Sequence, residues 1–129
     1  MPLAFEYTEP TRFHVTVDGK ITAKDVGVLL DRIFAHPKLK PGTDVLVDAR
    51  RAANALSTIE LRGIARDLRP LLDLGMGSVG VVTDNPFLYG VTRMFAVFAS
   101  AMGANVGAFY GMEDARRWLA ERRPGVVES

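Results

Sequence analysis

The sequence predicts an α/β fold in which a mixed sheet of about five strands starts antiparallel, continues parallel and packs against about four helices. Two observations predict it. From residue 12 onward, short apolar runs alternate with longer runs of helical periodicity, which is the pattern of successive βαβ units. One such unit, Val79 to Tyr110, contains an apolar strand, a Thr83 to Pro86 corner, a long apolar helix and a second apolar strand. We expect this unit to form the interior of the parallel sheet.

Composition narrows the class of protein. A chain of 129 residues is expected to form one domain, 1–129, with a core over about 3–122 and a flexible tail over 123–129. The absence of Cys excludes disulfides and thiolate metal sites and fits a cytoplasmic protein. A net charge near +1 gives no whole-molecule field for nucleic acid or an anionic membrane. We also expect no signal peptide and no membrane-spanning segment.

The amino-terminal part of the chain predicts a hairpin followed by a helix. Leu3 to Thr8 and Arg12 to Asp18 are short apolar bursts separated by Glu9-Pro10-Thr11, which indicates two antiparallel strands. The next helix, over Ala23 to about His36, is expected to begin after a Thr22 cap. Its expected buried residues are Val26, Leu29, Leu30, Ile33 and Phe34.

The middle of the chain predicts a buried strand and a capped helix. Val45 to Val47 is a continuously apolar strand ending at Asp48, which favours a central place in the sheet. Ser57 has the spacing of a capping box with Glu60, and Pro70 makes the end of the following helix irregular. The expected buried stripe of this helix is Ile59, Leu61, Ile64, Leu68, Leu71 and Leu72. Arg62, Arg66 and Arg69 form a basic row on the other side.

A last helix is expected to open at Gly111 and to stop at Pro124. Glu113 and Arg117 are spaced as an i, i+4 ion pair on its exposed side. Its inward residues are expected to be Met112, Ala115, Trp118 and Leu119.

The helix from Phe87 to about Met102 has two unlike faces. We expect the bulky face to lie on the sheet: Phe87, Leu88, Val91, Met94, Phe95, Phe98, Ala101 and Met102. The opposite face holds Tyr89, Thr92, Arg93, Ala96, Ala99, Ser100 and Gly103. These residues are mostly small and include one cation, whereas a solvated helix face usually carries several Lys and Glu. The pattern predicts a homodimer that buries this face.

Polar residues follow two of the predicted strands. Asp48 and Asp84 each end an apolar strand, so both are expected at the carboxyl edge of the sheet, where open α/β folds bind ligands. Arg50, Asn85, Tyr89 and Arg93 are expected near them, and together these six residues are a candidate site for a ligand or partner. The alternative is that they serve as helix caps and surface ion pairs.

Two other motifs favour structural roles. Gly75 to Gly80 matches the GxGxxG string of dinucleotide sites, but it precedes a strand where the motif requires a following helix. A C-terminal helix turn explains these glycines, and no cofactor is expected. His14 and His36 lie on distant elements without thiol companions, so no metal site is expected.

The chain resembles a known family over roughly Thr11 to Ala120. The segments that carry the resemblance are Asp18-Gly19 with Ile21-Thr22, Val45 to Arg50, Tyr89-Gly90 with Arg93-Met94-Phe95, and Phe109 with Ala115 and Trp118-Leu119. They are similar to the small bacterial SpoIIAA-like (STAS/CRAL-TRIO-like) domains. The resemblance implies a mixed sheet with packed helices, usually in a non-enzymatic role. It also implies Ser57, or Thr58 beside it, as a phosphoacceptor, although the family's Asp-Ser motif reads Leu56-Ser57 here.

The leading functional hypothesis is a non-enzymatic regulatory or scaffold module that binds a protein partner and acts as a homodimer. Its partner is expected near the Ser57 helix start and the Asp48/Asp84 edge. The alternative is a carrier of a small apolar or amphipathic ligand in a pocket under the 87–102 helix. An enzyme using Asp48, Asp84 and Arg93 is a third possibility.

Overall fold

The computed structural model describes residues 2–8 and 11–122. Its strands are β1 (Leu3–Thr8), β2 (Arg12–Gly19), β3 (Asp44–Ala52), β4 (Val79–Val82) and β5 (Val106–Phe109). Its helices are α1 (Ala23–Phe34), α2 (Thr58–Asp67), α3 (Arg69–Asp73), α4 (Pro86–Ala101) and α5 (Met112–Glu121). The predicted α/β class is confirmed.

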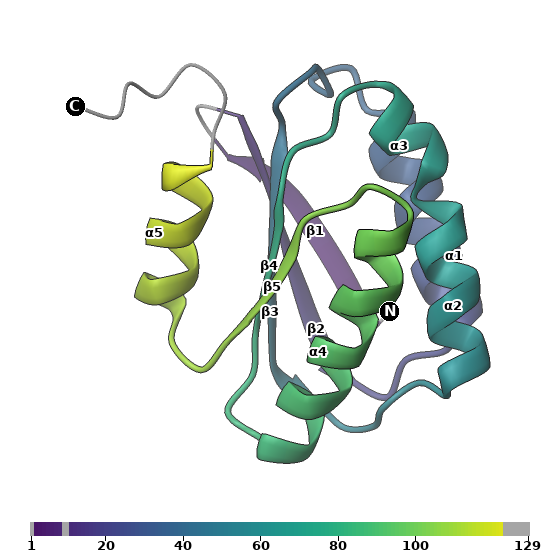
Figure 1. The fold of residues 1–129 in the computed structure, drawn as a ribbon, viewed down its shortest axis with the longest axis vertical. Coiled ribbons are helices and arrows are strands. Elements are labelled where there is room, and N and C mark those ends of the chain that lie inside the picture. The colour runs from purple at the N-terminus through teal and green to yellow at the C-terminus, as the bar shows by residue number, and fades with distance from the viewer. Residues whose placement is uncertain (1, 9–10, 123–129) are drawn as a thin grey trace.

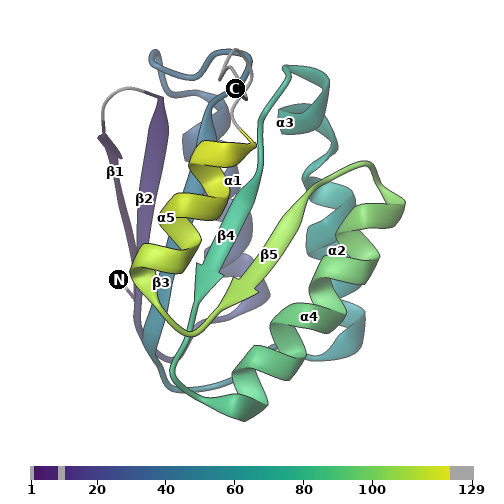
Figure 2. The same cartoon turned by 60° about the vertical axis from the view of Figure 1, so that its left-hand side comes forward.

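The sheet has five strands in the order β1-β2-β3-β4-β5. The β1–β2 pair is antiparallel and the other three pairs are parallel, as predicted. Helices α1, α2, α3 and α4 cover one face of the sheet, and α5 lies alone on the other (Figures 1 and 2). The central place predicted for β3 is confirmed. The interior place expected for the Val79 to Tyr110 unit is wrong for its second strand, because β5 forms an edge of the sheet.

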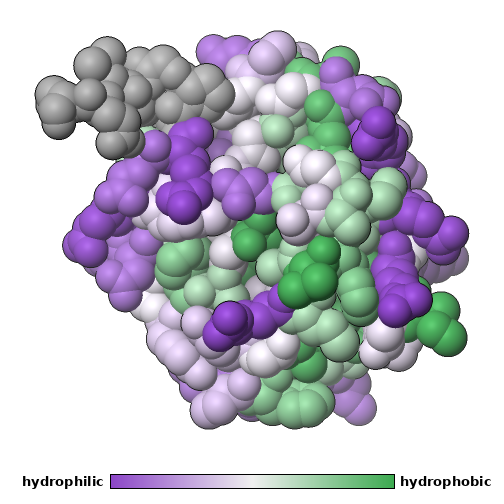
Figure 3. Space-filling view, in the orientation of Figure 1, coloured by the Kyte–Doolittle hydropathy of each residue, from purple (hydrophilic) through white to green (hydrophobic). Residues whose placement is uncertain are grey.

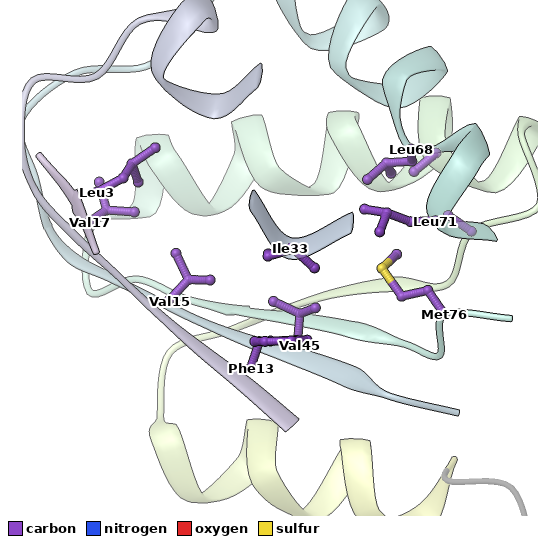
Figure 4. Close-up of a cluster of buried hydrophobic side chains, with 11 residues drawn as sticks. Leu3, Phe13, Val15, Val17, Ile33, Val45, Leu68, Leu71 and Met76 are labelled. Carbon is purple, nitrogen blue, oxygen red and sulfur yellow. The ribbon is translucent and has the colours of Figure 1, made fainter. Parts of the chain in front are cut away.

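Each face of the sheet has its own apolar core. The larger core, between the sheet and α1 to α4, includes Phe13, Val15 and Ile33 (Figure 4). The smaller core packs Leu46 and Val82 against α5. Alternation along the strands explains the division, because successive side chains point to opposite faces.

The predicted caps of α1 and α2 are confirmed. Thr22 and Ser57 each form a complete capping box, with Asp25 and Glu60 respectively. Asn85 caps α4, because its Oδ1 accepts hydrogen bonds from the backbone N–H groups of Phe87 and Leu88 at 2.8 and 3.3 Å. The single helix expected after Ser57 is divided into α2 and α3 at Leu68. Pro70 lies in the first turn of α3, where its missing N–H needs no partner.

Three large apolar residues that were expected to be buried are exposed. Ile59, Phe87 and Phe34 are 82%, 69% and 47% exposed. Ile59 and Phe87 lie in the first turns of their helices, and Phe34 is the last residue of α1. The sequence pattern identifies the face of a helix but not where the helix extends past the sheet.

The face of α4 that meets the sheet is also rotated from the expected one. Ala99 was expected on the small face that meets a second copy, but it is 0% exposed within the single chain, and Ala101 from the expected bulky face is exposed. Met94 and Phe98 face α2 instead, where Thr58 Oγ1 contacts Met94 Sδ at 3.9 Å and Arg62 stacks on the Phe98 ring. The helix therefore divides its bulky residues between the sheet and a neighbouring helix.

Several polar details differ from the expectations. The last helix pairs Glu113 with Arg116 and Asp114 with Arg117, both at i, i+3, in place of the expected Glu113–Arg117 pair. Strand β3 is longer than Val45 to Val47, and it begins at Asp44, which is paired with Arg12 of β2. Pro124, the expected tail over 123–129 and two of the predicted turn residues, Glu9 and Pro10, lie outside the described residues.

Candidate functional site

The predicted polar edge contains one tight ion pair. Arg50 donates from Nε to Asp48 Oδ1 at 2.9 Å and from a terminal nitrogen to Oδ2 at 2.8 Å. These side-chain hydrogen bonds are the largest cause of a pKa at Asp48 below its ordinary value of 3.8, and partial burial opposes them. Asp48 is therefore an ionised carboxylate, and both of its oxygens accept hydrogen bonds from Arg50. A general base needs a free acceptor position for the substrate proton, so this arrangement does not favour that role.

The other residues predicted at this edge do not complete a site. Asp84 is exposed, and it adds a weaker effect to that of Asp48 in raising the pKa of Arg50. Asn85 is occupied as the α4 cap. Tyr89 stacks on the Tyr110 ring with centroids 4.3 Å apart and, together with Arg93, lines a different groove. The predicted set of six residues is thus divided between two surfaces.

The topology explains why this edge has no ligand crevice of the expected kind. Such a crevice forms where the strand order reverses and neighbouring connections leave on opposite faces of the sheet. Here the order advances from β2 to β5 without reversal, and the connecting helices all lie on one face (Figure 1).

An apolar hollow lies beneath the helices. It is an apolar chamber of about 180 Å³ under the amino-terminal half of α4. We call it the outer chamber. Its lining includes Val47, Ala49 and Ala52 from β3, Val81 from β4, Asn54, Ala55 and Leu56 from the β3–α2 loop, and Leu88, Val91, Thr92 and Phe95 from α4.

A second apolar chamber of about 160 Å³ lies deeper in the same core. We call it the inner chamber. The two chambers share the lining residues Val17, Ile21, Val26, Val47, Ile64, Val81 and Phe95. An apolar cavity of about 150 Å³ can hold a benzene molecule, whereas close-packed native cores contain few voids larger than a water. The chambers are therefore large enough to matter for binding.

The polar side chains that line the outer chamber form hydrogen bonds within the protein. Asn54 accepts from the backbone N–H of Ile21 at 2.8 Å and donates to the Ile21 carbonyl at 3.0 Å. Thr92 Oγ1 donates to the Leu88 carbonyl at 2.9 Å. Thr83 Oγ1 accepts from a backbone N–H at 3.2 Å. Neither chamber has a charged lining residue in the described part of the chain.

The alternative hypothesis placed a ligand pocket under the 87–102 helix. The outer chamber lies under this helix, with α4 packed against β5 and α2. One signal was available in the sequence: Ala49, Ala52 and Ala55 supply small side chains where a buried strand and its loop usually supply large ones.

The residues at the start of α2 are exposed. Ser57 Oγ accepts from the backbone N–H of Glu60 at 3.2 Å, and Glu60 in turn accepts from the Ser57 N–H at 2.9 Å. The hydroxyl of Thr58 is directed to Met94. Both candidate phosphoacceptor hydroxyls are accessible, and both already make local contacts.

The basic row of α2 and α3 ties two helices together. Arg62 lies over the Phe98 ring at 4.9 Å, and Arg69 donates to the carbonyl of Met102 at 3.3 Å while pairing with Asp73. A groove of about 510 Å³ lies between α2 and α4, lined by Ile59, Arg62, Ala65, Arg66, Phe98, Ala101 and Met102.

Two searches of the described residues gave negative results. Over residues 2–8 and 11–122, no three or more His, Asp or Glu side chains are grouped so that they could hold a metal ion. Within the same ranges, no helix has both the length and the apolarity needed to cross a membrane.

Comparison with known proteins bears on the fold. No protein-family model matches the chain, and no curated protein matches it. Among solved structures, the chain is similar to an uncharacterised protein of the DUF3478 family from Shewanella loihica PV-4, described as having a SpoIIAA-like fold. The two are 21% identical, the TM-score is 0.56, and the match covers 91% of each chain. The sheet order, the helix placement and this match together show that the chain has a SpoIIAA-like α/β fold.

Proposed function

We propose that this protein binds a small, uncharged apolar molecule in the two chambers under α4, and that it acts by binding and not by catalysis. The observation that supports the proposal is a pair of adjoining apolar chambers of about 180 and 160 Å³ inside a single small domain. A ligand that fills these chambers binds the folded state and not the unfolded chain, so it stabilises the protein.

The lining determines the chemistry of the ligand. The side-chain polar groups of Asn54 and Thr92 are bonded within the protein, and no lining residue supplies a charge to pair with an ion. A buried carboxylate without a partner is strongly disfavoured. The expected ligand is a ring system or a medium-length chain whose polar group, if it has one, is neutral or stays at the mouth of the outer chamber.

Fluorescence titration with the neutral probe 1-N-phenylnaphthylamine tests the proposal. Saturable binding is expected, with displacement by 1-decanol at lower concentration than by decanoate. Ala49→Leu extends a side chain into the outer chamber and should weaken binding at least about tenfold, the loss of about 1.4 kcal/mol. Ala101→Leu, the same change on the exposed side of α4, is the matched control and should bind like the wild type.

Equal affinity of the Ala49→Leu and wild-type proteins, or no saturable binding at all, would contradict the proposal. Native mass spectrometry of gently purified protein gives a second measurement. A co-purifying small molecule that is reduced in Ala49→Leu supports a carrier.

A second candidate function is a STAS-like module that binds a protein partner. Ile59 and Phe87, 82% and 69% exposed, are large apolar side chains at the starts of α2 and α4. Ile59 also lines the α2–α4 groove beside Arg62 and Arg66, which would suit a partner with apolar and acidic side chains.

Paired affinity captures with wild-type and Ile59→Glu protein test this second candidate. A partner retained by the wild type and lost by the variant supports it, whereas identical captures count against it. Mass spectrometry of the peptide containing Ser57 and Thr58, from protein purified out of its native cells, tests whether either hydroxyl is phosphorylated. Phosphate at Ser57 would place a dianion beside the Glu60 carboxylate and would break the capping box.

A further inference from the structure

One side of α4 has no neighbour among the residues the structure describes. Helix α2 packs along the opposite side. The open side and the edge of β5 form a groove of about 420 Å³, lined mainly by Tyr89, Arg93, Ala96, Val97, Ser100 and residues 106–108. Figure 3 shows mostly apolar and weakly polar colours over α4 and β5, broken by a strongly hydrophilic group near the centre, with strongly hydrophilic colours over α5 on one side and along the opposite margin. We call this surface the α4–β5 face.

The strand on this face has unpaired backbone groups. The N–H of Val79 donates to the Asn105 carbonyl at 2.9 Å, and the N–H of Thr83 donates to the Phe109 carbonyl at 3.0 Å. The odd-numbered residues along this strand therefore direct their backbone N–H and C=O groups to β4. Because backbone groups alternate in direction along a strand, the N–H and C=O groups of Val106 and Ala108 point away from β4. An open strand edge next to an apolar groove is a surface that folded proteins usually cover.

We propose that a second copy of this chain covers the α4–β5 face, with the two α4 helices antiparallel across a twofold axis near Ala96 and Val97. The shape of the face is self-complementary. Val97 protrudes, with 68% of its surface exposed, and it stands beside a hollow lined by the small residues Ala96, Ser100 and Gly107. A twofold axis at this point places each Val97 against the hollow of the other copy, which is what an isologous interface requires. Small residues also allow two helices to approach closely.

The charge on the face also suits a second copy. Among the described residues, Arg93 is the one formally charged residue that lines the groove. Antiparallel helices that cross near Ala96 and Val97 bring Arg93 beside Ser100 of the partner subunit, near the carboxyl end of that helix, where the helix dipole is negative. The two Arg93 positions are then seven residues apart along the axis, or about 10 Å, so salt screens most of their mutual repulsion.

Sedimentation velocity from about 1 to about 200 μM tests the proposal, because a dimer forms by mass action. The wild type is expected to sediment as a dimer in the upper part of this range. Ala96→Glu and Val97→Glu should each shift it to a monomer with unchanged far-ultraviolet circular dichroism. Val97→Glu guards against misfolding, since position 97 is 68% exposed in the single chain. Ala101→Glu, which places the same charge at an exposed position off the face, is the control and should remain dimeric.

A monomeric wild type at the highest concentration overturns the proposal and leaves an extended peptide beside β5 as the other candidate occupant. Equal dissociation by Ala96→Glu and Ala101→Glu also overturns it, because the effect would then not be specific to the face. The dimer does not depend on the proposed ligand: Ala96→Glu is expected to bind 1-N-phenylnaphthylamine with wild-type affinity, since Ala96 lines neither chamber.

Discussion

Asp44 differs in burial from the carboxylates that the sequence analysis singled out. It is 2% exposed, and Arg12 reaches it with a bidentate contact of 2.7 and 3.3 Å. The pair joins the starts of β2 and β3, where the parallel part of the sheet begins. Nothing in the sequence around Thr43-Asp44 distinguishes this aspartate from a loop residue, because its partner is 32 positions away.

Asp44→Asn should lower the free energy of unfolding by about 3 kcal/mol, because it leaves a largely buried guanidinium without its counter-charge. Chemical denaturation measures the change. Asp18→Asn is the matched control, since Asp18 is exposed and its contact with Arg51 spans 3.3 Å at the surface. The control should change stability by less than about 1 kcal/mol. Similar losses in the two variants would show that burial does not govern these pairs.

Glu60 should make the stability of the fold depend on pH, and the direction of this dependence follows from its pKa. The hydrogen bond from the Ser57 backbone N–H is the main cause of a pKa below the ordinary 4.5. A lowered folded-state pKa stabilises the fold above pH 4.5, and that stabilisation is lost as the pH falls through the lowered value. Glu60→Gln removes the titration and keeps a capping side chain. The wild type is therefore expected to have a higher denaturation midpoint than the variant at pH 7. This difference in midpoint should be smaller at about pH 3.5. A difference that is independent of pH would contradict this assignment.

At the scale of elements, local signals located the helices and strands well. The capping boxes at Thr22 and Ser57 and the Asn85-Pro86 start of α4 depend on interactions over two or three residues, so the sequence contains all of their information. The rotation of α4 about its axis cannot be predicted from local signals. It depends on how the bulky residues of α4 are divided between its contacts with α2 and β5. The division between α2 and α3 at Leu68 could be predicted only in part. Pro70 predicts an irregular helix end, but it does not predict that a second short helix, α3, follows.

Ala99 provides a direct test of the orientation of α4. Ala99→Leu should destabilise the fold by about 1–3 kcal/mol through overpacking, since Ala99 is 0% exposed. Ala101→Leu, two residues away on the same helix, is exposed and should change stability by less than about 0.5 kcal/mol. Thermal unfolding of both variants measures the contrast. The orientation expected from the sequence, with Ala101 on the sheet, predicts the opposite ranking.

At the scale of the whole molecule, the candidate site is where sequence reasoning was weakest. Strand ends that carry Asp48 and Asp84 were correctly placed at one edge, but whether that edge forms a crevice depends on strand order and on which faces the helices cover. The chambers depend on volume: Ala49 from β3, Val81 from β4 and Phe95 from α4 leave space between them only in three dimensions. A small residue in the sequence can indicate either a void or a close contact, as Ala49 and Ala99 respectively show.

The two faces of the sheet should respond separately to mutation, because the chambers are lined by the sheet and by helices on one side, whereas α5 lies on the other side (Figure 2). Leu119→Ala removes a fully buried side chain beneath α5 and should lower the free energy of unfolding by about 2–5 kcal/mol. Its affinity for 1-N-phenylnaphthylamine should stay within about twofold of wild type, since sites without shared contacts act additively. Ala49→Leu should show the reverse pattern, with binding weakened and stability changed by less than about 1 kcal/mol, because the added methylenes enter existing space. Denaturation and titration of the same two preparations measure both quantities. A loss of affinity in Leu119→Ala that matches its loss of stability would show that the chambers depend on the α5 core.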